Sequence, residues 1–486
     1  MKKTVKRVIS LIMVVVICST SFFGLSANAT VTGNDYEYNN YPLIVVRGFD
    51  ILSFAYGNGE ETLKINIPEI ISVVSKFLFQ EFFFMKDDAM DTLLSYVNKL
   101  FGPIASDNNG EPIYKDVHIP QFNTSTANFD ISSFGKKHAQ GLIHESVDQL
   151  GAENVYVFTF DWRKTPDVYA RELDELIETA KEETGKDKVN IAATSMGAVA
   201  LTAYFNYIGY DKIDSAVILS GVQNGSDFAG KLFTGKIEIK KETVVNFVDS
   251  LVANQSPVVK ILLKIAGSIG IYDLLINIVS DVLVDHQKEL YDGFLRNTFA
   301  TAPGMWALCP DEYFDKGLEY IFDGVEDECA VVIEKIKGLR DFIFSTEKIL
   351  SRAYEENIKL SYVSNYGLGL IPIYEGSDTQ GDVVVSTYIT SNFAKVAPYG
   401  KQLSDEELAG VAPEFISPDK SVDASVCLYP EYTWFVKNAI HVGCSHGSEF
   451  ARFAIRLATG KSQPTVYDNE LYPRFLEVDE NQNFIR

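Results

Sequence analysis

The chain has 486 residues, of which 46% are hydrophobic, and a formal net charge of −23. This acidity excludes nucleic acid as a partner, because a phosphate backbone would be repelled. It otherwise indicates only a protein that stays in solution.

The N-terminal 29 residues have the three parts of a signal peptide. An apolar stretch at 8–23 is followed by the small-residue site Ala27-Asn28-Ala29. The positive charges before the stretch are Lys2, Lys3, Lys6 and Arg7. A permanent membrane anchor is the alternative, but the apolar run is short and ends in small polar residues. We therefore expect a secreted or extracytoplasmic protein that starts at Thr30, and losing these four charges lowers the net charge to −27.

The first predicted core strand, 43–47, is apolar and largely β-branched, as in a buried parallel strand. Gly48 follows it and permits a close backbone approach, so the amide of Phe49 is a candidate oxyanion donor. The alternative is that Gly48 only makes a tight turn.

An insertion is predicted over residues 50–149. Its most apolar part, 77–85, is rich in phenylalanine. We expect these rings to be buried, since aromatic clusters at helical spacing usually pack inside. Transient contact with a lipid surface is the alternative.

Ser195 stands where an apolar strand, 188–194, runs directly into a helical pattern. Small residues, Ala193 and Gly197, lie two positions before and after it. This is the layout of a nucleophile elbow, which exposes a serine hydroxyl and directs backbone amides toward an oxyanion. Met196 supplies the second candidate oxyanion donor. A serine at an ordinary helix N-cap is the competing interpretation.

An elbow serine needs an acid and a base later in the chain. Asp382 is the predicted acid, because a carboxylate beside three valines needs a partner such as a histidine N–H. Asp378 is the fallback. His441 ends the last predicted strand and is the predicted base, while His446 is the alternative.

The remaining pattern predicts an α/β protein with a mostly parallel sheet and helices on both faces, such as one over 169–184. The expected core strands cover 43–47, 154–160, 188–194, 215–220, 358–364 and 432–440. Residues 30–227 and 358–486 form this core. Residues 228–357 form a helical cap above Ser195, with helices over 244–252, 258–266, 271–284 and 330–354. Its apolar residues line an acyl pocket or only pack the cap onto the core.

Four cysteines remain after the signal peptide: Cys309, Cys329, Cys427 and Cys444. Export permits disulfides, and Cys309 with Cys329 is the more plausible pair. The cysteine spacings do not resemble a zinc site, and we expect neither a metal nor a cofactor.

Several segments resemble the α/β-hydrolases, and within them the bacterial lipases and the lecithin:cholesterol acyltransferase-like group. The matching segments are 42–49 for the strand and oxyanion loop, 160–163 for a Y/F-D-W-R motif, Ser195 for the nucleophile, 224–226 for the turn into the cap, 381–385 for the acid, and 434–441 for the last strand and histidine. The chain differs from the group's pattern at Arg47, Ala193 and Val383, which replace a histidine and two glycines.

This resemblance, together with the elbow, implies a serine hydrolase that cleaves lipid-like or other carboxylic esters through Ser195, His441 and Asp382. An acyltransferase with the same triad is the nearest alternative. A binding protein on a hydrolase scaffold, without catalysis, is the alternative from another class. The expected partner is a small-molecule or lipid ester.

Overall fold

The structure is a computed structural model that describes residues 37–63, 88–131, 140–252, 276, 280 and 285–485. The signal peptide, the aromatic stretch 77–85 and the cap helix predicted over 258–266 lie outside these residues. The helix predicted over 271–284 also does, apart from residues 276 and 280. In the described part of the chain, no helix combines the length and apolar character needed to cross a bilayer.

Seven strands of the described residues form a central sheet in the order β11-β10-β5-β4-β3-β1-β2, and every neighbouring pair is parallel. The strands are β1 (Leu43–Val46), β2 (Val155–Phe158), β3 (Val189–Thr194), β4 (Ile213–Leu219), β5 (Lys359–Tyr366), β10 (Thr433–Lys437) and β11 (Phe475–Glu477). The predicted α/β class with a parallel sheet is therefore confirmed, and the arrangement is consistent with an α/β-hydrolase-like fold. Because the strands are parallel, all their carboxyl ends meet at one edge.

Alternate strand residues enter two hydrophobic cores, one on each face of the sheet. In β1, Leu43 and Val45 pack on one face and Ile44 and Val46 on the other. The first face is covered by α4 (Gln140–Leu150) and α17 (Ser448–Thr459). The second is covered by α5 (Pro166–Thr184), α6 (Gly197–Tyr207) and α15 (Thr346–Glu355). Thus α4 is a core helix, although it lies within the predicted insertion.

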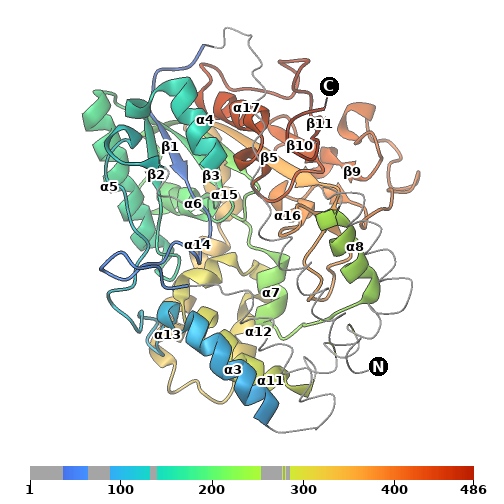
Figure 1. Cartoon of the computed structure of the whole chain (residues 1–486). Coiled ribbons are helices and arrows are strands. Elements are labelled where there is room, and N and C mark those ends of the chain that lie inside the picture. The colour runs from blue at the N-terminus through green and yellow to red at the C-terminus, as the bar shows by residue number, and fades with distance from the viewer. Residues whose placement is uncertain are drawn as a thin grey trace, which may run out of the picture.

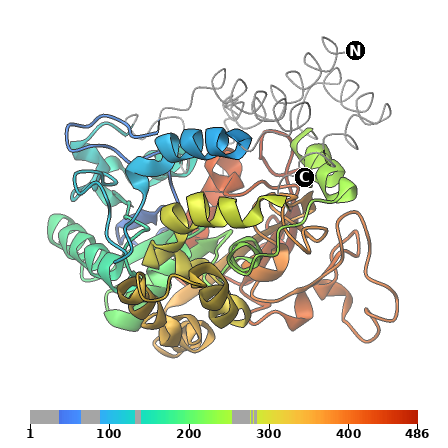
Figure 2. The same cartoon turned by 90° about the horizontal axis from the view of Figure 1, so that it is seen from below.

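Further helices gather at one end of the sheet, below it in Figure 1. They are α3 (Asp88–Phe101), α7 (Asp227–Phe233), α11 (Gln287–Leu290), a π-helix (Tyr291–Ala300), α12 (Asp311–Phe322), α13 (Ala330–Lys337) and α14 (Arg340–Ile343). Figure 2, the view from below, shows the blue α3 and the yellow to ochre helices lying across that end. Two hydrogen bonds attach them beyond the carboxyl ends of β2 and β4: Gly304 N donates to Arg163 O at 3.2 Å, and Ser226 N donates to Leu308 O at 2.8 Å.

Another group of elements is connected through mutual contacts to β7 (Gln380–Gly381), which directly precedes Asp382. Besides β7, they are α8 (Lys241–Val252), β6 (Leu368–Gly369), α16 (Thr387–Thr390), β8 (Lys395–Val396) and β9 (Val422–Asp423). β6 pairs with β7 and β8 pairs with β9, both antiparallel.

Two predicted elements differ from the structure. The single helix expected over 330–354 is divided into α13, α14 and α15, because α13 ends at Lys337, directly before Gly338, and a turn at Ser345 precedes α15. The strand expected over 432–440 ends at Lys437, since Asn438 takes a left-handed conformation with φ +61°.

The predicted Cys309–Cys329 disulfide is wrong, because both cysteines are free, as are Cys427 and Cys444. All four side chains are buried in apolar surroundings, and burial raises the pKa of each thiol, to about 11 for Cys427 and about 12 for Cys444. A buried thiol in such surroundings packs as a small apolar group and stays protonated.

Candidate active site

Ser195 occupies a tight turn between β3 and α6 at the carboxyl edge of the sheet. Its φ is +52°, and its backbone N–H donates to Leu219 O at 3.0 Å, which ties the turn to the end of β4. A Cβ at position 197 would stand 2.5 Å from Val46 O, so the first residue of α6 must be glycine. The small residues that flank the serine therefore let α6 start directly against β1.

The structure brings Ser195, His441 and Asp382 into one chain of hydrogen bonds. His441 Nε2 lies 2.8 Å from Ser195 Oγ, and His441 Nδ1 lies 2.8 Å from Asp382 Oδ2. Since a carboxylate only accepts hydrogen bonds, Nδ1 carries the proton and Nε2 is free to accept the serine proton. The histidine ring is 18% exposed and the carboxylate fully buried, so the base can reach a substrate while its orienting acid cannot.

Asp382 is held in a short loop after β7 that uses both of its carboxylate oxygens. Oδ1 accepts the amides of Val384 at 3.1 Å and Val385 at 2.7 Å, which leaves Oδ2 for the histidine. This loop requires φ +84° at Val383, a conformation that suits glycine. Valine at position 383 thus takes a conformation that a glycine, the residue of the G-D-G-x-V pattern, would adopt without strain.

The predicted alternatives lie elsewhere in the fold. His446 follows a short 3-10 turn, Gly443–Ser445, and the ring that bonds Ser195 is that of His441. Asp378 lies in the turn before β7, where its carbonyl accepts Tyr399 N at 2.9 Å, and the carboxylate that bonds His441 is that of Asp382.

The two predicted oxyanion donors flank the serine. A Cβ at position 48 would stand 2.7 Å from the Cβ of Ser195, so Gly48 allows the loop after β1 to touch the nucleophile. Among the described residues, neither Phe49 N nor Met196 N donates to a protein acceptor. Two unpaired backbone amides beside a nucleophile are what an oxyanion hole requires.

Arg47 fixes this loop through an ion pair with Asp50. It is buried, and its Nη2 pairs with Asp50 Oδ2 at 2.7 Å. Burial lowers the pKa of Arg47, whereas the charge of Asp50 opposes that shift. Asp50 Oδ1 also accepts the amides of Leu52 at 2.8 Å and Ser53 at 3.1 Å, so one ion pair and two turn bonds fix the backbone around Gly48 and Phe49.

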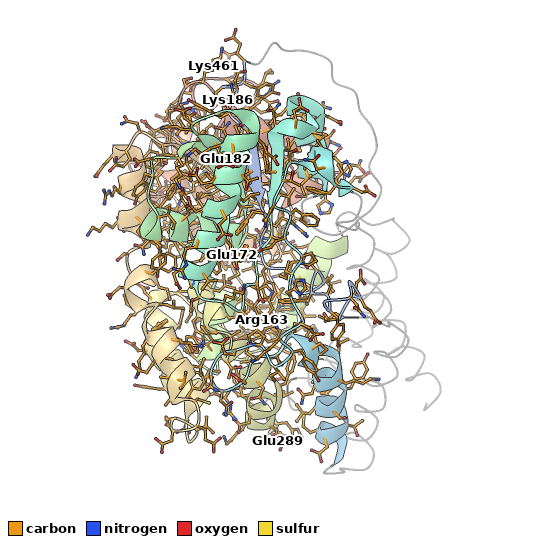
Figure 3. All side chains as sticks on the ribbon, turned by 90° about the vertical axis from the view of Figure 1, so that its left-hand side faces the viewer. Arg163, Glu172, Glu182, Lys186, Glu289 and Lys461 are labelled. Carbon is orange, nitrogen blue, oxygen red and sulfur yellow. The ribbon has the colours of Figure 1, made fainter. Side chains whose placement is uncertain are left out.

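The F-D-W-R segment after β2 supports the same loop. Trp162 Nε1 donates to Asp50 O at 3.2 Å, and its ring lies 4.8 Å from that of Phe49. Arg163 is buried, pairs with Asp161 through Nη2 at 2.6 Å, and donates to Val117 O at 2.7 Å. Figure 3 shows Arg163 between the core helices above and α3 below.

Sequence reasoning missed two side chains beside the histidine loop. Asn365 lies near the carboxyl end of β5, one residue beyond the predicted end of that strand. A polar side chain at the carboxyl end of a predicted strand is a signal from which sequence reasoning could have found it. Gln482 lies in a turn after β11 and has no local signal, because its contact depends entirely on the tertiary fold. Asn365 donates a hydrogen bond to the backbone carbonyl of Ile440, and Gln482 accepts one from its backbone N–H.

Comparisons with known proteins add little to this geometry. No family model matches the chain, and no curated protein matches it. Among solved structures, a chain of the Tle4–Tli4 complex is similar, with 10% sequence identity and a TM-score of 0.34, over 68% of this chain and 75% of that chain. At so low a sequence identity and TM-score, the similarity bears on neither activity nor substrate. We therefore infer function from the residues of the site.

Proposed function

We propose that this protein is a serine hydrolase that cleaves carboxylic esters with lipid-like acyl groups. The observation that carries the proposal is the hydrogen-bonded chain from Ser195 Oγ through His441 to the buried Asp382, at 2.8 Å for each bond. Such a chain activates a hydroxyl that is otherwise a weak nucleophile.

In this mechanism, Ser195 Oγ attacks the acyl carbonyl while His441 Nε2 takes its proton. The amides of Phe49 and Met196 then stabilise the negative charge on the former carbonyl oxygen. His441 returns the proton to the departing alcohol, which leaves an acyl-enzyme. Water, activated by the same ring, attacks the acyl-enzyme and releases the carboxylic acid. Asp382 holds the ring's tautomer and stabilises the imidazolium throughout.

The test uses the mature protein, a fluorophosphonate probe and p-nitrophenyl butyrate. We expect Ser195 to be labelled and the ester to be hydrolysed, and Ser195→Ala to lose both while keeping its circular dichroism spectrum and unfolding midpoint. A folded wild type that is neither labelled nor active would favour the binding-protein alternative. Full activity in Ser195→Ala would refute the triad.

Product analysis separates the hydrolase from an acyltransferase. In the presence of an added long-chain alcohol, we expect mainly free carboxylic acid. A product that is mainly the new ester would identify an acyltransferase that uses the same three residues.

We also propose that the protein is exported, on the basis of the N-terminal 29 residues. Fractionation of the cells that produce it, with N-terminal sequencing of the secreted form, tests this proposal. Thr30 is the expected first residue.

A further inference from the structure

Ile440, the residue directly before His441, is held at both of its backbone polar groups by side-chain amides. Its N–H donates to Gln482 Oε1 at 3.0 Å, and its C=O accepts from Asn365 Nδ2 at 2.9 Å. Both amide side chains are buried, with exposed fractions of 3% for Gln482 and 1% for Asn365. Neither bond belongs to a helix or a strand pair.

These two amides come from separate parts of the fold. Asn365 lies near the end of β5 and also donates to Ser220 Oγ at 3.0 Å, at the end of β4. The backbone carbonyl of Asn365 accepts a hydrogen bond from Thr387 Oγ1 at 2.8 Å, which connects Asn365 to the segment after the acid loop. Gln482 comes from the turn that follows β11. Ile440 is thus fixed against both the sheet and the C-terminal turn.

The turn that carries His441 needs such support. Val442 has φ +54°, an unfavourable conformation for a β-branched residue, and Gly443 N donates back to Ile440 O at 2.8 Å. Strained backbone of this kind persists only where the surroundings determine it. The amide of His441 itself donates to Asp382 O at 2.7 Å, so this bond and the two side-chain amides fix the backbone on the N-terminal side of the histidine Cα.

We propose that Asn365 and Gln482 are positioning residues that set the place of the His441 ring relative to Ser195 and Asp382. The proposal rests on the proposed function for its kinetic consequence. A ring held by two bonds of 2.8 Å tolerates little displacement, and a shift of about 1 Å in a reacting group costs roughly 10²-fold in rate.

The chain offers a matched control at the opposite edge of the sheet. Asn190 is also a fully buried amide, and its Nδ2 donates to the backbone carbonyl of Tyr41 at 3.1 Å and to Asn39 Oδ1 at 2.7 Å. It lies in β3 near the amino ends of the strands, away from the triad. Removing it should weaken the fold without moving His441.

The experiment compares Gln482→Met, Asn365→Leu and the control Asn190→Leu with wild type, using p-nitrophenyl butyrate. We expect kcat to fall about 10- to 100-fold in the first two variants with KM within about twofold, and to stay unchanged in the control. Gln482→Glu keeps an oxygen that accepts from Ile440 N, and we expect it to restore most of the lost kcat. Unfolding midpoints identify any variant that fails to fold.

A second readout does not depend on activity. The proton on Nδ1 of His441, assigned by its loss in His441→Gln, should give a sharp NMR signal in wild type and Asn190→Leu. We expect it to broaden or vanish in Gln482→Met and Asn365→Leu. Folded variants that keep both the signal and the wild-type kcat would overturn the positioning role, whereas an inactive wild type refutes the proposed function and leaves the NMR result to decide the positioning role.

Discussion

Unusual backbone conformations lie at or next to each residue of the proposed triad. Ser195 has φ +52°, Val383 beside Asp382 has φ +84°, and Val442 beside His441 has φ +54°. Conformations of this kind cost about 1–3 kcal/mol each for residues other than glycine. The surrounding bonds, such as those from Val384 and Val385 to Asp382, keep the residues in place.

Val383 gives a direct test of this strain. Replacing it with glycine should raise the free energy of unfolding by about 1 kcal/mol, because relief of the positive φ outweighs the backbone freedom that glycine adds to the unfolded chain. Chemical denaturation measures the change, and kcat should remain near wild type. Val385→Gly is the control, since Val385 is buried without a positive φ and its loss should destabilise. Equal destabilisation by both variants would contradict the role of strain.

The choice of base is tested by two alanine variants. His441→Ala should lower kcat by about 10⁴-fold or more, because the proton acceptor for Ser195 Oγ is gone. His446→Ala should stay within about threefold of wild type. The measurement is kcat on p-nitrophenyl butyrate, and the opposite ranking would move the base to His446.

At the residue scale, sequence could find Ser195, Asp382 and His441 because each stands after a recognisable strand or turn. It favoured His441 over His446 only because His441 ends the last predicted strand, since how the turn at 440–443 folds leaves no local pattern. It could not find Gln482 at all. A side-chain contact across 42 residues leaves no local pattern.

Among the elements, α7 and the acid loop are joined by one half-buried contact. Ser386 Oγ, directly after the acid loop, donates to Asp227 Oδ2 at 2.7 Å in the first turn of α7. Burial raises the pKa of Asp227 above its ordinary value of 3.8, with Glu312 adding to the shift, while the Ser386 hydroxyl and Lys231 oppose it. The ionised form of the Asp227 carboxylate, which connects α7 to the segment after the acid loop, is therefore less stable in the folded protein than in water.

This contact predicts a pH dependence of stability. A raised pKa means that the folded state holds the Asp227 proton where the unfolded state has lost it, so wild-type stability falls as pH rises from 3.8 to the raised value. Asp227→Asn cannot ionise and still accepts from Ser386. We therefore expect its unfolding midpoint to exceed that of wild type at pH 7, with the difference shrinking toward pH 4. A difference that is constant with pH would refute the shift.

Element boundaries were predicted best where apolar runs are long and least well where they are broken. β3 was found because it is a continuous buried run, and β4 because it is one from Ser215 onward. β11 was not, since its three residues, Phe475–Glu477, give no alternation to recognise. The break between α13 and α15 depends on Gly338 and on packing of Leu339 and Phe342, which helical periodicity alone does not reveal.

For the molecule as a whole, the cap position bears on substrate choice. Trp306, fully buried, packs against Phe233 at 4.6 Å and Phe314 at 5.7 Å, so a tightly packed apolar layer lies over the carboxyl edge of the sheet. An apolar layer there favours esters whose acyl chain it can shield from water. Sequence predicts a cap from its place in chain order, but how its side chains share packing and substrate contact is a property of the assembled layer.

Medium or long acyl esters should therefore be preferred to acetyl esters. Each additional buried methylene contributes about 0.8 kcal/mol, so kcat/KM should rise about fourfold per methylene until the pocket is filled. A series of p-nitrophenyl esters from acetyl to dodecanoyl measures this, with Ser195→Ala as the background. A maximum at acetyl would make the cap a packing layer alone and identify an esterase for small substrates.

The distance along the chain between the triad residues has a consequence for refolding. Ser195 and His441 are 246 residues apart and His441 and Asp382 are 59 apart, and they meet where the ends of β3 and β10 in the central sheet come together with the loop after β7. Contacts of such sequence separation form late, because the intervening loops must close first. Partly folded intermediates should consequently be silent to a serine-directed probe. For the proposed hydrolase, the return of labelling after dilution from denaturant then marks the moment at which β3, β10 and the loop of Asp382 have come together, and makes this serine a built-in reporter of that step.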